Sequence, residues 1–367
     1  MAAIDVLLPM RDAMPYLGEA IDSIRCQTVR DWRLIVLDHG STDGSLELAQ
    51  QMSDVDRRIS VFSCPQADSV GALRNIGLEK CDCRYLLLQD ADDVSYPNRM
   101  EVVGGAFGAQ PQLLAVGGDA VLIDPGGKRT GYLRRPANPK MVAAANIFYN
   151  PMLHPTIAAN FPALKLLGGA YGRDILKVVP QSESITANHL AEDYMLFGQV
   201  ALLGPCANIP LPLVQYRRHA KSVSIANPVG QIEVALKISR FLARSFCAMN
   251  GLAPFDPGPF CNHADYVFDF GRQDYAGAFA HLSAVLRRGL GNSPELEREL
   301  AFRHVLATRS SAKMLSRFLR FQLRYLPWPT ERRTVRNWIL RDMRRGKFVY
   351  RAKETTVGAG AAGTVWE

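Results

Sequence analysis

The stretch Tyr85-Leu-Leu-Leu-Gln-Asp90-Ala-Asp92-Asp93 determines how the first half of this 367-residue chain is interpreted. A short apolar run bounded by polar residues is typical of a central strand in a parallel sheet. Three carboxylates follow within four residues, at the end of the strand where open α/β sheets bind ligands. Such carboxylates repel one another, and Mg2+ or Mn2+ would offset the repulsion and bind phosphate oxygens in turn. A solvated acidic turn is the alternative, so the surrounding sequence has to decide.

Strand and helix patterns alternate through roughly the first 125 residues. Alternation at this spacing predicts right-handed crossovers and a mostly parallel sheet. Ser41 or Thr42 is expected to cap the helix that begins near Ser45. The predicted strands are residues 4–9, 32–37, 59–64, 85–89 and 113–117, and the predicted helices are residues 16–27, 45–52 and 71–80.

Polar turns follow three of the predicted strands, at residues 9–12, 38–43 and 90–93. Parallel strands end at the same edge of a sheet, so these turns should lie together. Taken alone, the segment Asp38 to Gly44 is an ordinary turn, because Gly, Ser and Asp are turn formers. Taken together, the three turns favour a nucleotide site.

Composition sets the general class of the protein. Hydrophobic residues make up 48% and charged residues 21%, as in soluble globular proteins, and the length favours two domains. The net charge of +8 indicates attraction to an anionic partner. Seven cysteines are scattered without a disulfide or zinc pattern, which favours reduced thiols in the cytoplasm. The first residues contain neither a basic segment nor a long apolar run, so no signal peptide is expected, and no apolar run approaches the roughly eighteen residues that span a bilayer.

These motifs resemble the family 2 glycosyltransferases, which are inverting enzymes with the GT-A fold. The resemblance covers about residues 3 to 226 and follows the order of the family's motifs. It implies a Rossmann-like α/β domain of the nucleotide-diphospho-sugar transferase type, with a mostly parallel sheet flanked by helices and a C-terminal helical region. The matching segments are residues 9–12, 22–28, 38–43, 72–78, 89–93, 168–171, 191–196 and 216–224.

The resemblance implies a donor site at the three turns. Asp38 would accept a hydrogen bond from the imide N–H of uracil, and Arg74 would neutralise the diphosphate of the sugar nucleotide. Asp90 would lie near the ribose. Asp92 would ligate a Mn2+ or Mg2+ ion that bridges the two phosphates and assists departure of the nucleoside diphosphate. The donor-binding set also includes Pro9, Arg11 and Ala91.

The resemblance also assigns a catalytic base. An inverting transfer needs a carboxylate that takes the proton of the acceptor hydroxyl, and Asp193 matches the second acid of the family's acidic pair. Glu192 is expected to point elsewhere, because adjacent residues of a helix do not face the same way. His154, Glu192 and Tyr171 are assigned to the acceptor side. His219 is assigned to the metal or the diphosphate, with a structural histidine as the alternative.

Some positions depart from the family pattern. Arg11 stands where an aromatic residue usually packs near the uracil, and a guanidinium can also stack on a base. Gln89 replaces an apolar residue and is expected to matter little. Asp93 is expected to brace the following segment, and Arg217 and Arg218 are expected to contact phosphate.

The function that the resemblance implies is transfer of a hexosyl or N-acetylhexosaminyl group from a UDP-sugar to a hydroxyl of a glycan or lipid-linked acceptor. The expected setting is assembly of cell-surface polysaccharide or lipopolysaccharide. A Gln-x-x-Arg-Trp motif, typical of processive members, is absent at residues 215–219, which favours single addition. A nucleotidyltransferase that makes sugar nucleotides is one alternative, although residues 9–14 lack its glycine-rich loop. A non-catalytic glycan- or membrane-binding relative is the other, and the presence of Asp92 and Asp193 weighs against it.

The family motifs stop near residue 228. The chain is expected to divide into a catalytic domain at 1–227, a basic helical region at 228–353 and a flexible tail at 354–367, with helices at 232–249 and 275–290.

The helical region is strongly basic near its end. Thirteen Lys and Arg residues lie from Lys313 to Lys353, against two acids, with aromatic residues and leucines interleaved. A basic helix with aromatic residues on its other face is typical of a protein on an anionic membrane surface, here the inner face. Packing on the catalytic domain is the alternative for residues 313–353. Nucleic acid is not an expected partner, since no nucleic-acid-binding module is present.

Overall fold

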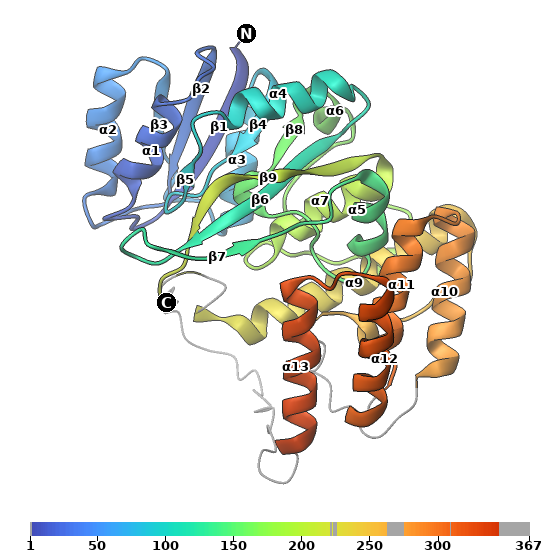
Figure 1. Ribbon diagram of the computed structural model, residues 1–367. Coiled ribbons are helices and arrows are strands. Elements are labelled where there is room, and N and C mark those ends of the chain that lie inside the picture. Colours follow the sequence, from blue (N-terminus) through green and yellow to red (C-terminus); the bar gives the residue numbers. More distant parts are fainter. Residues whose placement is uncertain (1, 221, 223–225, 263–274, 309, 345–367) are drawn as a thin grey trace, which may run out of the picture.

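The computed structural model describes residues 2–220, 222, 226–262, 275–308 and 310–344 (Figure 1). Its first part is the predicted alternation of strands and helices. The strands β1 (Ala2–Met10), β2 (Trp32–Asp38), β3 (Ile59–Ser63) and β4 (Cys83–Leu88) pair in parallel in the order β3-β2-β1-β4. The connecting helices are α1 (Leu17–Arg25), α2 (Ser45–Val55) and α3 (Val70–Lys80). The predicted elements of this part are therefore confirmed to within a few residues.

Beyond β4 the sheet becomes mixed. It continues in the order β4-β8-β6-β9-β5, with β7 paired to β6, and only β6 and β9 pair in parallel there. The short strands arrive from irregular segments, so no crossover helix imposes a parallel direction. The α/β class is confirmed, with antiparallel pairs added to the parallel half. The added elements are β5 (Val94–Ser95), α4 (Arg99–Ala109), β6 (Ala115–Ile123), β7 (Arg129–Leu133), β8 (Ala158–Asn160) and β9 (Cys206–Arg217).

Strand β6 is longer than predicted, because it continues through Gly117 and Gly118, which are residues that usually weaken strands. A Cβ atom at Gly117 would overlap the side chain of Asn208, and one at Gly118 would overlap Leu213, both on the neighbouring β9. The two glycines therefore allow β9 to approach β6 closely.

Helices cover both faces of the sheet. Along β1, Val6 and Leu8 point into one core, which α1, α2 and α4 complete, while Leu7 points into the opposite core with α3. This division follows the two-residue period of a strand. The second core is completed by α6 (Phe161–Leu166) and α7 (Glu192–Leu203).

Replacing Gly77 by Ala tests how closely α3 lies on the sheet. A Cβ atom at Gly77 would overlap Leu7 and Leu37, which are 1% and 0% exposed and therefore have little room to move. Overpacking of this kind costs about 1–3 kcal/mol, so we expect Gly77→Ala to lower the free energy of unfolding by that amount. The matched control is Gly104→Ala in α4, where no atom lies within 4 Å of the new Cβ. Chemical denaturation of both variants should show a lower free energy of unfolding for Gly77→Ala alone.

The C-terminal part, from residue 228, is helical and lies against the α/β part (Figure 1). Tyr194 and Met195 of α7 share a core with Ile238, Phe241 and Leu242. The predicted helices in this region are confirmed, while the boundary between residues 227 and 228 stays a prediction. The tail at 354–367 lies outside the described residues. The helices are α5 (Pro139–Asn146), α9 (Pro228–Asn250), α10 (Ala276–Leu290), α11 (Pro294–Leu306), α12 (Ser311–Arg324) and α13 (Pro329–Arg344), with short 3-10 turns at His154–Thr156, Gln181–Glu183 and Gly258–Phe260.

The aromatic residues of the basic region do not form a surface. Phe318, Phe321 and Trp338 are 7%, 4% and 5% exposed and pack with Phe302 and Val305 of α11. The expectation that Phe and Trp present an exposed membrane face was therefore wrong, because these large side chains are needed to hold α11, α12 and α13 together. None of the helices described combines the length and hydropathy needed to cross a bilayer.

Candidate active site

The first two polar turns are joined by hydrogen bonds. The N–H of Asp12 donates to the Ser41 hydroxyl (3.0 Å), and the N–H of Thr42 donates to the Asp12 carboxylate (2.8 Å). The Asp43 carboxylate accepts from the N–H of Ser45 (3.0 Å) at the start of α2. Neither Ser41 nor Thr42 caps this helix, contrary to the prediction, since both are used between the turns. The two turns thus lie side by side at the carboxyl edge of the sheet.

Asp38 is fully buried at the end of β2. Its two carboxylate oxygens accept hydrogen bonds from the N–H groups of Gly40 and Ser41, each at 3.1 Å. These bonds fix the turn, which shapes the wall of the site. Pro9 is buried in β1, and the side chain of Arg11 is exposed just beyond the strand. A direct contact of Asp38 with a base stays a prediction.

Gln89 organises the third turn, although it was expected to matter little. Its amide donates to the carbonyl oxygens of Asp90 (3.0 Å) and Asp93 (2.8 Å), and it accepts from Ser95 (2.7 Å) and Arg99 (3.0 Å). That expectation was wrong, because the Gln89 side chain is fully buried and its hydrogen bonds hold the turn in place. Arg99 was not predicted at all. Burial lowers the pKa of its guanidinium to about 10.

Asp93 and Arg217 join the third turn to β9. The Asp93 carboxylate accepts from the backbone N–H of Arg217 at 2.7 Å, so Asp93 braces the structure as expected, although the braced segment is β9. The Arg217 side chain donates to the carbonyl of Asp92 (2.9 Å) and to the carboxylate of Glu19 (2.5 Å), and it is 2% exposed. The expectation that Arg217 contacts phosphate was wrong. Burial and the charges of Asp92 and Asp90 raise the pKa of Asp93 well above its usual value.

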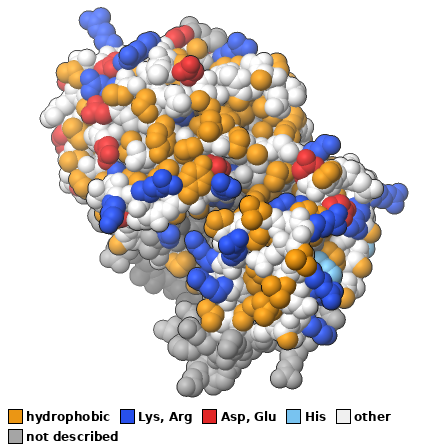
Figure 2. Space-filling view, in the orientation of Figure 1, with side chains coloured by type: hydrophobic (Ala, Val, Ile, Leu, Met, Phe, Trp, Pro, Cys, Tyr) orange, Lys and Arg blue, Asp and Glu red, His pale blue; other side chains and the backbone are white. Residues whose placement is uncertain are grey.

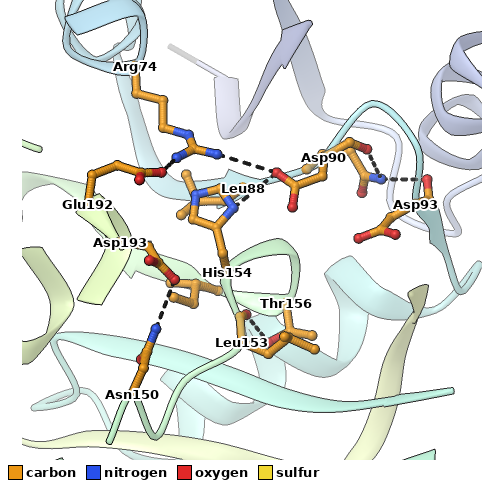
Figure 3. A network of polar contacts seen from close by, with 12 residues as sticks. Arg74, Leu88, Asp90, Asp93, Asn150, Leu153, His154, Thr156, Glu192 and Asp193 are labelled. Atoms are coloured by element: carbon orange, nitrogen blue, oxygen red, sulfur yellow. Dashed lines mark hydrogen bonds and ion pairs between the residues drawn. The ribbon is translucent and has the colours of Figure 1, made fainter. Parts of the chain in front are cut away.

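A charged network lies beside this turn (Figure 3). Arg74 of α3 is ion-paired with Glu192 at the start of α7, and its guanidinium also lies 3.5 Å from the Asp90 carboxylate. The same Asp90 oxygen lies 3.1 Å from Nδ1 of His154. Burial alone would raise the pKa of Asp90, but the charges of His154, Arg74 and Arg99 lower it. The ring of the fully buried Tyr171 lies 5.5 Å from the Arg74 guanidinium.

The two acids of the Glu192-Asp193 pair face different ways, as expected for neighbours on a helix. Glu192 is buried against Arg74, whereas Asp193 is partly exposed and turns toward Asn150 (Figure 3). The Asn150 amide donates to Oδ2 of Asp193 at 2.8 Å. Asn150 was missed from the sequence, because it belongs to no motif and only the folded chain brings it to α7. Its bond fixes the orientation of the carboxylate.

Several buried polar atoms around this network have no hydrogen-bond partner among the described residues. They are Nε of Arg74, Nε2 of His154, Oδ2 of Asp93 and the hydroxyl of Tyr171. Buried polar groups are nearly always paired in folded proteins. Four such atoms in one region therefore indicate a place where a polar ligand completes the hydrogen bonds.

Asp92 and His219 form a separate pair at the same edge. Oδ2 of Asp92 lies 2.8 Å from Nε2 of His219, and both side chains are partly exposed. A carboxylate and an imidazole are both ligands of divalent metal ions, so Asp92 and His219 would hold such an ion at this edge. An imidazole ligand favours Mn2+ over Mg2+. Among the described residues no group of three or more metal-binding side chains occurs.

The fold and this edge are those of an α/β protein with a polar site at the carboxyl ends of its parallel strands. Residues 5–158 match the family model described as Glycosyl transferase family 2. Relatives include an uncharacterized glycosyltransferase of Haemophilus influenzae, 27% identical over 65% of this chain and 72% of the relative. The O-antigen biosynthesis glycosyltransferase WbnJ of Escherichia coli is 27% identical over 60% of this chain and 81% of its own length.

A solved structure has the same fold. The chain aligns with residues 1–349 of S. aureus TarS, crystallised with UDP-GlcNAc, at a TM-score of 0.54 and 13% identity, covering 88% of this chain and 93% of TarS 1–349. The predicted GT-A fold and glycosyltransferase class are therefore confirmed, and the nucleotidyltransferase alternative is set aside. The family match ends before Asp193 and His219, whose roles stay predictions.

Proposed function

We propose that this enzyme is an inverting glycosyltransferase that moves a sugar from a UDP-sugar to a hydroxyl of a glycan or lipid-linked acceptor. The observation that carries the proposal is that Arg74, Asp90 and Asp193 lie together beside the third turn (Figure 3). The relatives support the acceptor class, since WbnJ is named for O-antigen biosynthesis. A Bacillus subtilis relative, 30% identical over 98 residues, is named for teichuronic acid biosynthesis. The setting we infer is assembly of cell-surface polysaccharide.

Arg74 is the group that would receive the donor diphosphate. It is held by two carboxylates, Glu192 and Asp90, and its Nε has no hydrogen-bond partner within the described part of the chain. A planar guanidinium suits phosphate oxygens, and an arginine already held in position loses little rotamer entropy when it binds them. Asp90 and Ala91 would border the ribose, while Pro9, Arg11 and the turn fixed by Asp38 would border the uracil.

Asp92 and His219 would hold a Mn2+ ion next to the diphosphate. When bound, such an ion supplies Lewis acidity to the departing nucleoside diphosphate. His219 also packs against Tyr16, with the two rings tilted by 36° and their centroids 5.1 Å apart, so its ring is held in place from a second side.

Asp193 would act as the general base. Its Oδ2 accepts from Asn150, which leaves Oδ1 to take the proton of the acceptor hydroxyl. As the acceptor oxygen bonds to the anomeric carbon, the bond to the diphosphate oxygen breaks on the opposite face, and the configuration inverts. Tyr171 and Glu192, which lie beside Arg74, and His154, which lies beside Asp90, would border the acceptor.

The location we propose is the cytoplasm, at the inner face of the membrane that carries the acceptor. All seven cysteines are free thiols, and six of them are buried, which suits a reducing compartment.

A donor panel tests the proposed function. UDP-, GDP- and dTDP-sugars with Mn2+ should be compared by the shift of the melting temperature, since a ligand that binds the folded protein stabilises it. We expect a rise with at least one UDP-sugar that disappears when Mn2+ is removed with a chelator. A stable protein that shows no shift with any sugar nucleotide would contradict the proposal and favour a non-catalytic relative.

A further inference from the structure

Helix α12 presents three different rows of side chains. Met314, Phe318 and Phe321 form the buried row, which packs against α11 and α13. Residues three or four positions apart lie on one side of a helix, and two further rows run along α12 beside the buried one. One consists of leucines and the other of cations.

The leucine row faces away from the protein. Leu315, Leu319 and Leu323 follow one another at four-residue spacing and are 48%, 53% and 89% exposed. Leu326, just after the helix, is 75% exposed. Isolated exposed leucines are ordinary, but a continuous row of them marks an interaction surface.

The cation row lies next to the leucine row. Lys313, Arg317, Arg320 and Arg324 occupy the spacing of one helix side, and α12 contains no acidic residue. Arg317 donates to the carbonyl of His304 at 3.1 Å, whereas Lys313, Arg320 and Arg324 are exposed. Figure 2 shows hydrophobic and basic side chains side by side over the helical part of the molecule.

We propose that the leucine row of α12 inserts into the interface of an anionic lipid bilayer, while the cation row contacts the lipid phosphates. Helices that lie in a bilayer interface combine an apolar face with a Lys- and Arg-rich face in this way. A second copy of the chain fits less well, because joining two leucine rows would bring together two helices that each carry four cations and no acid. This inference depends on α12 alone and does not require the transfer reaction.

Vesicle binding of single variants tests the inference. The protein is sedimented with vesicles of equal parts phosphatidylglycerol and phosphatidylcholine, and with vesicles of phosphatidylcholine alone. Leu323→Ser is compared with Leu166→Ser, because both leucines lie on helices and are 89% exposed. We expect binding to the anionic vesicles only, weakened about tenfold by Leu323→Ser and unchanged by Leu166→Ser. Removing one cation, as in Arg320→Gln, should weaken binding about fivefold.

Other outcomes would overturn the inference. Wild-type protein that stays in solution with anionic vesicles would contradict it, and so would vesicle binding that Leu323→Ser leaves intact. A dimer that is lost in Leu323→Ser, without vesicle binding by the wild type, would assign the row to a second copy instead. Melting temperatures confirm that each variant is folded, and donor-induced shifts of these temperatures show separately whether the proposed transferase site is intact.

Discussion

Replacing Asp193 by Asn should lower the rate of sugar transfer by about 10²–10⁴-fold, the usual contribution of a general base. The amide keeps an acceptor for the Asn150 side chain but cannot take a proton at pH 7. The donor should still bind, because Arg74 is paired with Glu192 and Asp90, and Asp193 is bonded to Asn150. In this variant the transfer rate should therefore fall, while the rise in melting temperature caused by the donor should stay as in the wild type.

The matched control for the base is Asp54→Asn, which removes an exposed carboxylate on α2. It should change neither the transfer rate nor donor binding. Normal turnover of Asp193→Asn would show that another group takes the proton. Loss of donor binding together with turnover would assign Asp193 to the donor site.

Replacing Asp92 by Asn should lower Mn2+-supported transfer by about 10²–10³-fold, because a metal ion typically contributes several kcal/mol of charge stabilisation. An amide oxygen can still accept a hydrogen bond from His219, so the change removes the charge and leaves the shape nearly intact. Donor affinity in the presence of Mn2+ should fall as well. The measurements are transfer rates over a range of Mn2+ concentrations and calorimetric titration of the donor.

Asp82→Asn is the control for the metal pair. Asp82 is exposed just before β4, at the end of the strand opposite to Asp92. This variant should retain the Mn2+ response of the wild type. A wild-type response in Asp92→Asn would contradict the assignment of the metal to this pair.

The sequence predicted the parallel half of the sheet well, because its signals are local. The apolar runs of β1, β2 and β4 are buried on both faces, and the turns after them carry the polar residues. Parallel pairing then brings the turns to one edge, as the bonds between Asp12, Ser41 and Thr42 demonstrate.

Other features depend on contacts between distant residues. Strand β8 has three residues, too few for a periodic pattern, and it forms only because β4 and β6 lie on either side of it. Arg217 was expected to contact phosphate because it lies in a family motif, but in the folded chain β9 places it against Asp92 and Asp93 of the third turn. Asn150 meets Asp193 across 43 residues of sequence.

The basic helices show a similar limit. Composition gave the cations and the apolar residues of α12 but not which apolar residues are buried. The bulky Phe318 and Phe321 fill the core with α11, and the leucines remain outside. The neighbouring helices decide which side chains of α12 are buried, and the sequence of one helix does not reveal where its neighbours lie.

The most direct test of the whole account is a crystal structure of the enzyme with a UDP-sugar and Mn2+. It should contain the diphosphate between Arg74 and Asp92, the ion bound by Asp92 and His219, and the anomeric carbon on the side of Asp193. A nucleotide bound away from this edge, or a sugar whose anomeric carbon faces away from Asp193, would contradict it.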